Sequence, residues 1–172
     1  PTVIKRLAEQ FNNAFCLVEI NDIGGQVADV LYSDLEYENV LMTSHQGRKG
    51  QTISGGFGKG GVQFGVRTSQ VVKKLGCSVL KSLLEEDKMI VEDQDIVNEL
   101  TTFVAKKQSY EADDGHNDDL VMCLVLFGWL TRQEYFKNLT NIDVRTDIYQ
   151  DEIDQLEEDM SPFGFIDTGI EE

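Results

Sequence analysis

The sequence predicts an α/β domain over residues 1–139, followed by an acidic tail over residues 140–172. Residues 14–20 form a continuous apolar run with one acid near its end, which is typical of a strand covered on both faces by helices. Residues 120–129 form a second run that carries no charge. This run predicts a helix that is buried on most of its faces and too short to span a membrane. Helix and strand patterns also alternate over residues 2–42, as α/β proteins require.

Hydrophobic spacing places the other elements. Apolar residues recur every three to four positions in the segments expected to be helices, which are 2–12, 27–35, 68–84 and 96–103. Short apolar or extended runs predict strands over 40–42, 89–91 and 106–111. Asp93 or Asp95 is expected to cap the helix that follows it, and the long apolar helix should end near Gln133.

The segment from His45 to Gly65 differs in composition from the rest of the chain. Eight of its residues are glycine, and apolar side chains such as Ile53 and Phe57 alternate with basic ones. Long loops inside a domain are uncommon unless they are functional. We therefore expect a glycine-bearing β-hairpin whose backbone approaches another molecule closely, although a plain flexible loop explains the same composition.

Charge is distributed unevenly along the chain, whose net charge is −16. Residues 140–172 contain eleven Asp or Glu and one Arg, a net charge of −10, and this tail is expected to be peripheral or partly disordered. By contrast, no acid occurs between Glu38 and Glu85, where the chain carries seven basic residues. This basic region predicts a phosphate-binding surface. Its residues expected to bind DNA are Arg48, Lys49, Lys59, Arg67, Lys73 and Lys74.

Cysteine and histidine content narrows the class of protein further. The three cysteines, Cys16, Cys77 and Cys123, form no Cys-x-x-Cys pair, which favours a reducing intracellular setting over a disulfide scaffold. Two histidines make a structural zinc site improbable on composition. The chain begins at Pro1, and we expect it to be part of a longer protein.

Two adjacent acids, Asp118 and Asp119, stand at the start of the long apolar helix. Asn117 or Asp118 can cap its first turn, where backbone N–H groups lack partners. Capping needs only one side chain, so the second carboxylate is available to a cation. A pair of acids that only caps the helix remains an alternative explanation.

Glu19 is the other informative acid, because it lies at the carboxyl end of the predicted strand, where ligands gather in α/β sheets. Carboxylates with room for water suit Mg²⁺ or Mn²⁺. Two such ions could clamp the attacking and leaving oxygens of a phosphodiester. Metal-dependent phosphodiester hydrolysis therefore explains the acids and the basic region together.

Four blocks of this sequence resemble the nuclease domain of the large terminase subunit, the DNA-packaging motor of tailed bacteriophages, and in particular its T-even-like group. The blocks occur in the order of that family, and the last is followed by Phe-Gly-Trp; they are Cys16–Asn21, Asp34–Glu38, Gly76–Lys81 and Gly115–Met122. The resemblance implies an RNase H-like sheet with flanking helices. It also implies a Mg²⁺- or Mn²⁺-dependent endonuclease that cuts concatemeric double-stranded DNA when packaging starts and ends.

The same resemblance implies roles for individual residues and partners. Glu19 and Asp119 take the positions of catalytic, metal-binding acids, and Asp118 hydrogen-bonds or binds metal through water. His116 is a possible accessory residue, because many relatives have His at the position of Asn117. The implied partners are DNA, an ATPase domain of the same polypeptide, the portal and the small terminase subunit. The implied location is the host cell cytoplasm, without membrane attachment.

The sequence also departs from the family pattern. RNase H-like nucleases use an Asp on a strand upstream of the position of Glu19, and no acid in strand context precedes Glu19 here. We therefore expect the first strands to be missing and cleavage by these residues alone to be impaired. No ATPase phosphate-binding motif occurs either. Two alternatives stay open: another RNase H-like nuclease such as a resolvase or exonuclease, and a non-catalytic module that docks on DNA or the portal.

Overall fold

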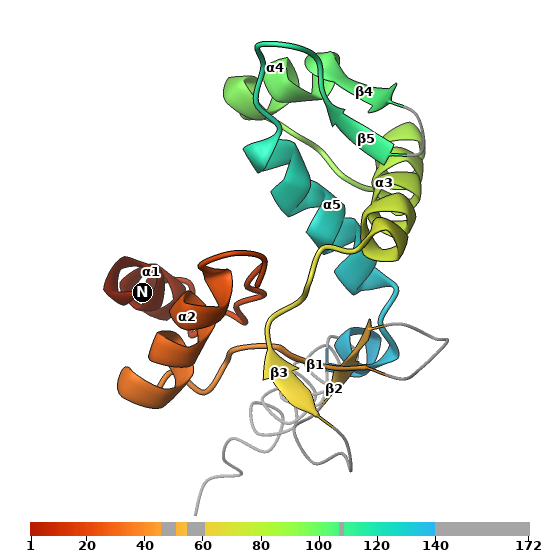
Figure 1. Cartoon of the computed structure of the whole chain (residues 1–172). Coiled ribbons are helices and arrows are strands. Elements are labelled where there is room, and N and C mark those ends of the chain that lie inside the picture. Colours follow the sequence, from red (N-terminus) through yellow and green to blue (C-terminus); the bar gives the residue numbers. More distant parts are fainter. Residues whose placement is uncertain (46–50, 55–60, 107–108, 140–172) are drawn as a thin grey trace, which may run out of the picture. The chain divides into compact units, whose positions relative to one another are not determined.

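The computed structural model describes residues 1–45, 51–54, 61–106 and 109–139, and its helices and strands are labelled in Figure 1. The helical elements are α1 (Thr2–Gln10), α2 (Gly24–Asp29), a π-helical turn η1 (Val30–Asp34), α3 (Gln70–Glu85), α4 (Gln94–Thr102) and α5 (Asp119–Thr131). The strands are β1 (Met42–His45), β2 (Gln51–Ser54), β3 (Val62–Phe64), β4 (Phe103–Lys106) and β5 (Ser109–Ala112). The chain is therefore a mixed α/β domain, as the alternation of patterns predicts.

The strands form small antiparallel sheets. In the first, β1 lies between β2 and β3, so that Thr43 pairs with Ile53 on one side and with Gln63 on the other. The expected hairpin in the glycine-rich segment is thus represented by the β1–β2 pair, while residues 46–50 and 55–60 lie outside the described residues. In the second sheet, β4 pairs with β5, where the sequence predicts one strand over residues 106–111.

The apolar run over residues 14–20 is extended but is not a regular strand, and the prediction that it is covered on both faces is wrong. It makes single parallel bridges, from Cys16 to Val40 and from Glu19 to Val66. Each neighbouring segment meets only one part of the run, so no continuous ladder forms. Phe15 is 46% exposed, because apolar residues of this run line an open cavity instead of a closed core.

Helices α3 and α5 pack closely along a glycine contact. A Cβ on Gly76 would clash with the backbone oxygen of Val125, and one on Gly128 would lie 2.9 Å from the backbone oxygen of Gly76. Hydrophobic side chains surround this contact, with Leu80, Val121 and Val125 buried on one side of it. A second cluster joins α5 to the first sheet, where Trp129 belongs to the same buried group as Ile53 of β2 and Leu41, which directly precedes β1. This packing fixes the direction of α5 and the place of its first residues.

Two predictions of local structure need correction or adjustment. Residues 89–91 are not a strand: Ile90 is 82% exposed, because this short apolar run has no neighbouring strand to pair with among the described residues. The predicted helix over 96–103 begins earlier, at Gln94, and Asp93 caps it by accepting from the backbone N–H groups of Asp95 and Ile96.

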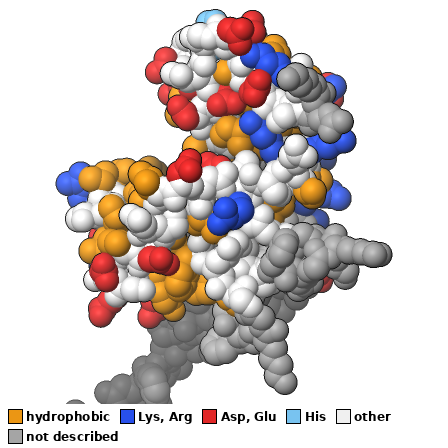
Figure 2. Space-filling view, in the orientation of Figure 1, with side chains coloured by type: hydrophobic (Ala, Val, Ile, Leu, Met, Phe, Trp, Pro, Cys, Tyr) orange, Lys and Arg blue, Asp and Glu red, His pale blue; other side chains and the backbone are white. Residues whose placement is uncertain are grey.

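Helix α1 forms where the sequence predicts an amphipathic helix, but most of its apolar face is exposed. Ala8 is its only buried residue, while Val3 and Phe11 are 60% and 73% exposed. Hydrophobic side chains accordingly gather on the surface over α1 in Figure 2. Within the described residues, no helix combines the length and the apolar composition needed to cross a membrane.

Candidate active site

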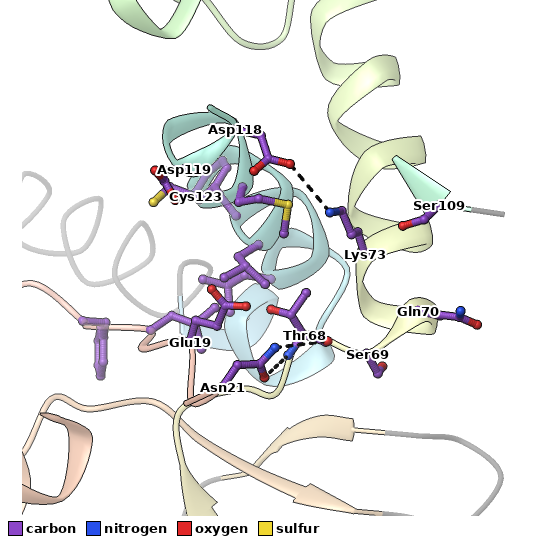
Figure 3. A pocket seen from close by; sticks show the side chains of 16 residues that line it. Glu19, Asn21, Thr68, Ser69, Gln70, Lys73, Ser109, Asp118, Asp119 and Cys123 are labelled. Carbon is purple, nitrogen blue, oxygen red and sulfur yellow. Dashed lines mark hydrogen bonds and ion pairs between the residues drawn. The ribbon is translucent and has the colours of Figure 1, made fainter. Parts of the chain in front are cut away.

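An open cavity of about 660 Å³ brings the three predicted acids together (Figure 3). Glu19 approaches it from the extended segment, while Asp118 and Asp119 reach it from the start of α5. Lys73 of α3 adds a basic side chain to the cavity lining, and Ser69, the N-cap residue of α3, adds a hydroxyl group. Acids that are a hundred positions apart in sequence therefore face one space.

Glu19 is held by its backbone. Ile20 donates its N–H to the backbone oxygen of Val66, and Val66 donates to Val18, so residues on both sides of Glu19 are fixed. Helix α2 begins directly against this segment, because a Cβ on Gly24 would clash with the backbone oxygen of Glu19. The Glu19 side chain itself is exposed and free to meet a ligand in the cavity.

The two aspartates have different surroundings. The Oδ2 atom of Asp118 accepts from the backbone N–H of Ala112 at 3.3 Å and lies 3.8 Å from Lys73 Nζ. The carboxylate of Asp119 is exposed. Neither Asp119 nor Glu19 has a hydrogen-bond or ion-pair partner for its carboxylate in the part of the chain that the structure describes. Asp118 is thus a restrained acid, whereas Asp119 and Glu19 are available.

The expectation that Asn117 or Asp118 caps α5 is wrong. Asp118 is the N-cap residue by position, yet its side chain makes no capping hydrogen bond. Instead, Oε2 of Glu99 in α4 accepts from the backbone N–H groups of Leu120 and Val121, at 2.8 and 3.1 Å. The Asp118 carboxylate faces Lys73 instead and accepts from the backbone N–H of Ala112.

Cys123 lies on the same face of α5 as Asp119, one helical turn further along, and lines the cavity. Partial burial raises the pKa of its thiol, and the negative charges of Glu19, Asp119 and Glu99 raise it further. The pKa of the thiol therefore responds to the charge of these three acids. Sequence reasoning missed Cys123, although its i, i+4 spacing from Asp119 was a usable signal; nothing in the sequence near the Asp pair pointed to Glu99.

The predicted basic residues are divided between the cavity and the surface. Lys73 lies in the cavity beside Asp118, with its Nζ 5.8 Å from the centre of the Phe103 ring. Arg67 and Lys74 are exposed. The other three predicted DNA contacts, Arg48, Lys49 and Lys59, lie outside the described residues.

The start of α3 adds polar groups to the same cavity. Ser69 caps the helix by accepting from the backbone N–H of Val72, and Asn21 hydrogen-bonds to the backbone of Thr68. The Thr68 hydroxyl is buried and has no hydrogen-bond partner among the described residues. His116 does not line this cavity; it is exposed and lines another, of about 420 Å³, together with Asn117 and Glu99.

The donor chemistry of the cavity suits a hydrated divalent cation. Among the described residues, no three His, Cys, Asp or Glu side chains are close enough to form a metal cluster. The available donors are the carboxylates of Glu19 and Asp119, which have no partner within the described residues, while Asp118 lines the same cavity but faces Lys73. Mg²⁺ fits such a set, because it retains several waters and is commonly bound by one or two carboxylates together with substrate phosphates.

Residues 1–127 match the family model of the terminase RNaseH-like domain. The matched region covers most of the chain and includes all three acids of the cavity. It confirms both the RNase H-like fold class and the resemblance to the terminase nuclease domain.

Proposed function

The chain belongs to the terminase RNase H-like domain family, and we propose that it is the metal-dependent endonuclease of a DNA-packaging terminase. In this proposal it cuts concatemeric double-stranded DNA when packaging of a genome starts and when it ends. The family membership supports a nuclease-type module of a packaging motor. The cutting reaction, its cation and its substrate are the parts proposed here.

One observation carries the proposal: the carboxylates of Glu19 and Asp119 line one cavity, and neither has a basic partner among the described residues. Both side chains are exposed, so water can solvate each charge, and it is their placement on one partly apolar cavity that distinguishes them from other surface acids. Two acids of this kind, supplied by distant segments, indicate a site that is completed by a cation. Leu17, Met122 and Leu126 provide the apolar walls.

We assign Mg²⁺ or Mn²⁺ to Glu19 and Asp119, with Asp118 interacting through water. When bound, such a cation supplies a nucleophilic hydroxide and stabilises charge on the phosphodiester oxygens. Asp119 and Glu19 hold the cation and fix where the scissile phosphate lies. Lys73 holds Asp118 in place by its charge, and it is close enough to the cavity to contact a DNA phosphate as well.

The duplex is expected to contact basic side chains beyond Lys73, including two that are neighbours in sequence of the cavity residues Thr68 and Lys73. Arg67 and Lys74 are exposed and can contact phosphates, and we assign the same role to Arg48, Lys49 and Lys59 on sequence grounds. Such contacts position DNA without reading its sequence. They therefore suit an enzyme that cuts wherever the motor stops.

We also propose a biological setting, on the basis of the family to which the chain belongs. We expect the nuclease to act beside an ATPase domain of the same polypeptide, together with the portal and the small terminase subunit. Its place of action would be the cytoplasm of the infected host cell. The lineage within tailed phages, for which the sequence blocks favour the T-even-like group, is likewise a proposal.

Plasmid nicking tests the proposal directly. Supercoiled plasmid is incubated with the chain in EDTA, Ca²⁺, Mg²⁺ or Mn²⁺, and the relaxed and linear forms are measured. We expect cleavage in Mn²⁺ and Mg²⁺ and none in EDTA. Cleavage that persists in EDTA would refute the metal-dependent mechanism. DNA binding without cleavage in every cation, even by a longer polypeptide, would favour the non-catalytic docking module.

A further inference from the structure

The first turn of α5 poses a problem of hydrogen bonding for the acids that stand there. The initial N–H groups of any helix lack partners within the helix, and an Asp at the N-cap position normally accepts from one of them. Asp118 occupies that position. If it capped α5, its carboxylate would turn back along the helix and leave Lys73 and Ala112.

Glu99 removes this conflict. Its Oε2 atom accepts from the N–H groups of both Leu120 and Val121, the two that an N-cap side chain would normally reach. The Asp118 carboxylate is then free to accept from Ala112 and to face Lys73. Asp119, in the first turn, keeps a carboxylate that has no partner in the described part of the chain.

Glu99 is itself held firmly. It lies in α4, which Asp93 caps at its beginning, and α4 packs against α5. Leu100 and Phe103, which follow Glu99 in the chain, pack on Val121 and Val125 of α5. Glu99 therefore reaches the start of α5 from a neighbouring helix that carries none of the cavity acids.

We propose that Glu99 is a positioning residue: by capping α5 from α4, it keeps Asp118 and Asp119 directed to the cavity instead of to their own helix. The expected consequence is tighter binding of the catalytic cation, and this part of the inference rests on the proposed function. Glu99 does not line the cavity and is not proposed to touch metal or DNA.

Two conservative variants separate the reach of Glu99 from its charge. Glu99→Gln keeps an oxygen at the same distance but removes the charge. Glu99→Asp keeps the charge, but its side chain is one methylene too short to bridge from α4 to both N–H groups. Both preserve the helical position, and their folding is checked by circular dichroism and thermal unfolding.

The first readout needs no metal. Amide hydrogen exchange is measured by NMR at Ala112, whose N–H is bound by Asp118 in the structure. In Glu99→Asp we expect Asp118 to turn back and cap α5, so that Ala112 exchanges at least severalfold faster, while Glu99→Gln matches the parent. An Ala112 rate that is unchanged in Glu99→Asp would overturn the inference.

The second readout is Mn²⁺ affinity, measured from the free-ion signal in electron paramagnetic resonance. We expect Glu99→Asp to bind Mn²⁺ about tenfold more weakly than the parent, as is typical when a residue that orients metal ligands is lost. Glu99→Gln should stay closer to the parent. The reverse order would show that Glu99 acts through its charge alone and would overturn the inference. A parent chain that binds no Mn²⁺ would instead count against the proposed function, and the Ala112 exchange rate would still decide whether Glu99 frees the Asp pair.

Discussion

Replacing Gly24 by Ala is expected to displace Glu19 although no acidic residue is substituted. The added Cβ would clash with the Glu19 backbone oxygen, so either α2 or the Glu19 segment must move. Overpacking of this kind costs about 1–3 kcal/mol. Gly25 provides a matched control, because it is the next residue of the same helix and a Cβ there meets nothing within 4 Å. Both substitutions bring the same gain in helix propensity, up to about 1 kcal/mol.

The difference between the two variants therefore isolates the contact with Glu19. Gly24→Ala should be less stable than Gly25→Ala by about 1–3 kcal/mol, which corresponds to a melting temperature roughly 2–12 °C lower. It should also cleave plasmid more slowly at a temperature where both variants are folded, because the Glu19 carboxylate is displaced. If both variants melt together and cleave at the parent rate, the close approach of Gly24 does not position Glu19.

Three further predictions address the Cys123 thiol, an Asp upstream of Glu19, and the basic residues expected to bind DNA. Because negative charges help to raise the Cys123 pKa, Mn²⁺ bound at the carboxylates should lower this pKa. Alkylation of Cys123 at fixed pH should then become faster when Mn²⁺ is added, and Cys123→Ser is the control. An alkylation rate that does not change with Mn²⁺ would argue against a cation at these carboxylates. A longer polypeptide that supplies the upstream Asp implied by the family should cleave faster than residues 1–172 at equal Mn²⁺, and equal rates would show that this Asp is dispensable. Alanine substitution at four basic residues should weaken DNA binding at all sequences alike; these residues are Arg48, Lys49, Lys59 and Arg67. The slope of log affinity against log salt concentration should become shallower by about 0.9 for each phosphate that is no longer neutralised. Unchanged binding at every salt concentration would exclude these residues as the DNA contacts.

The elements that the sequence predicted well are those with a long hydrophobic period. Helices α3 and α5 form nearly where expected: apolar residues of α3 recur over several turns, α5 is a long uncharged run, and the two helices meet at Gly76 and Gly128. Short runs were less reliable. Residues 14–20 and 89–91 are apolar, but pairing into a strand depends on neighbours that a local pattern does not specify.

The sequence identified the three acids that line the cavity, but not the contacts that hold them. Glu19 and the Asp pair were identifiable, because charged residues beside apolar runs need a reason to be there. The pairing of Asp118 with Lys73, and the capping of α5 by Glu99, depend on how α3 and α4 pack against α5. Such contacts between distant helices leave no signature in residue spacing, so they became visible only in the structure.

The most direct test of the proposed nuclease site compares Asp119→Asn with Asp118→Asn in Mn²⁺-dependent plasmid cleavage. Each substitution keeps the shape of the side chain but removes its negative charge, and both variants are first brought to matched stability by choice of temperature. Because Asp119 is unpartnered while Asp118 is held by Lys73 and Ala112, Asp119→Asn should abolish cleavage and Asp118→Asn should only reduce it. The assay is run in a polypeptide that cleaves measurably. Loss of activity in Asp118→Asn alone would make Asp118 the essential metal ligand instead, and cleavage at the parent rate by both variants would contradict the nuclease assignment itself.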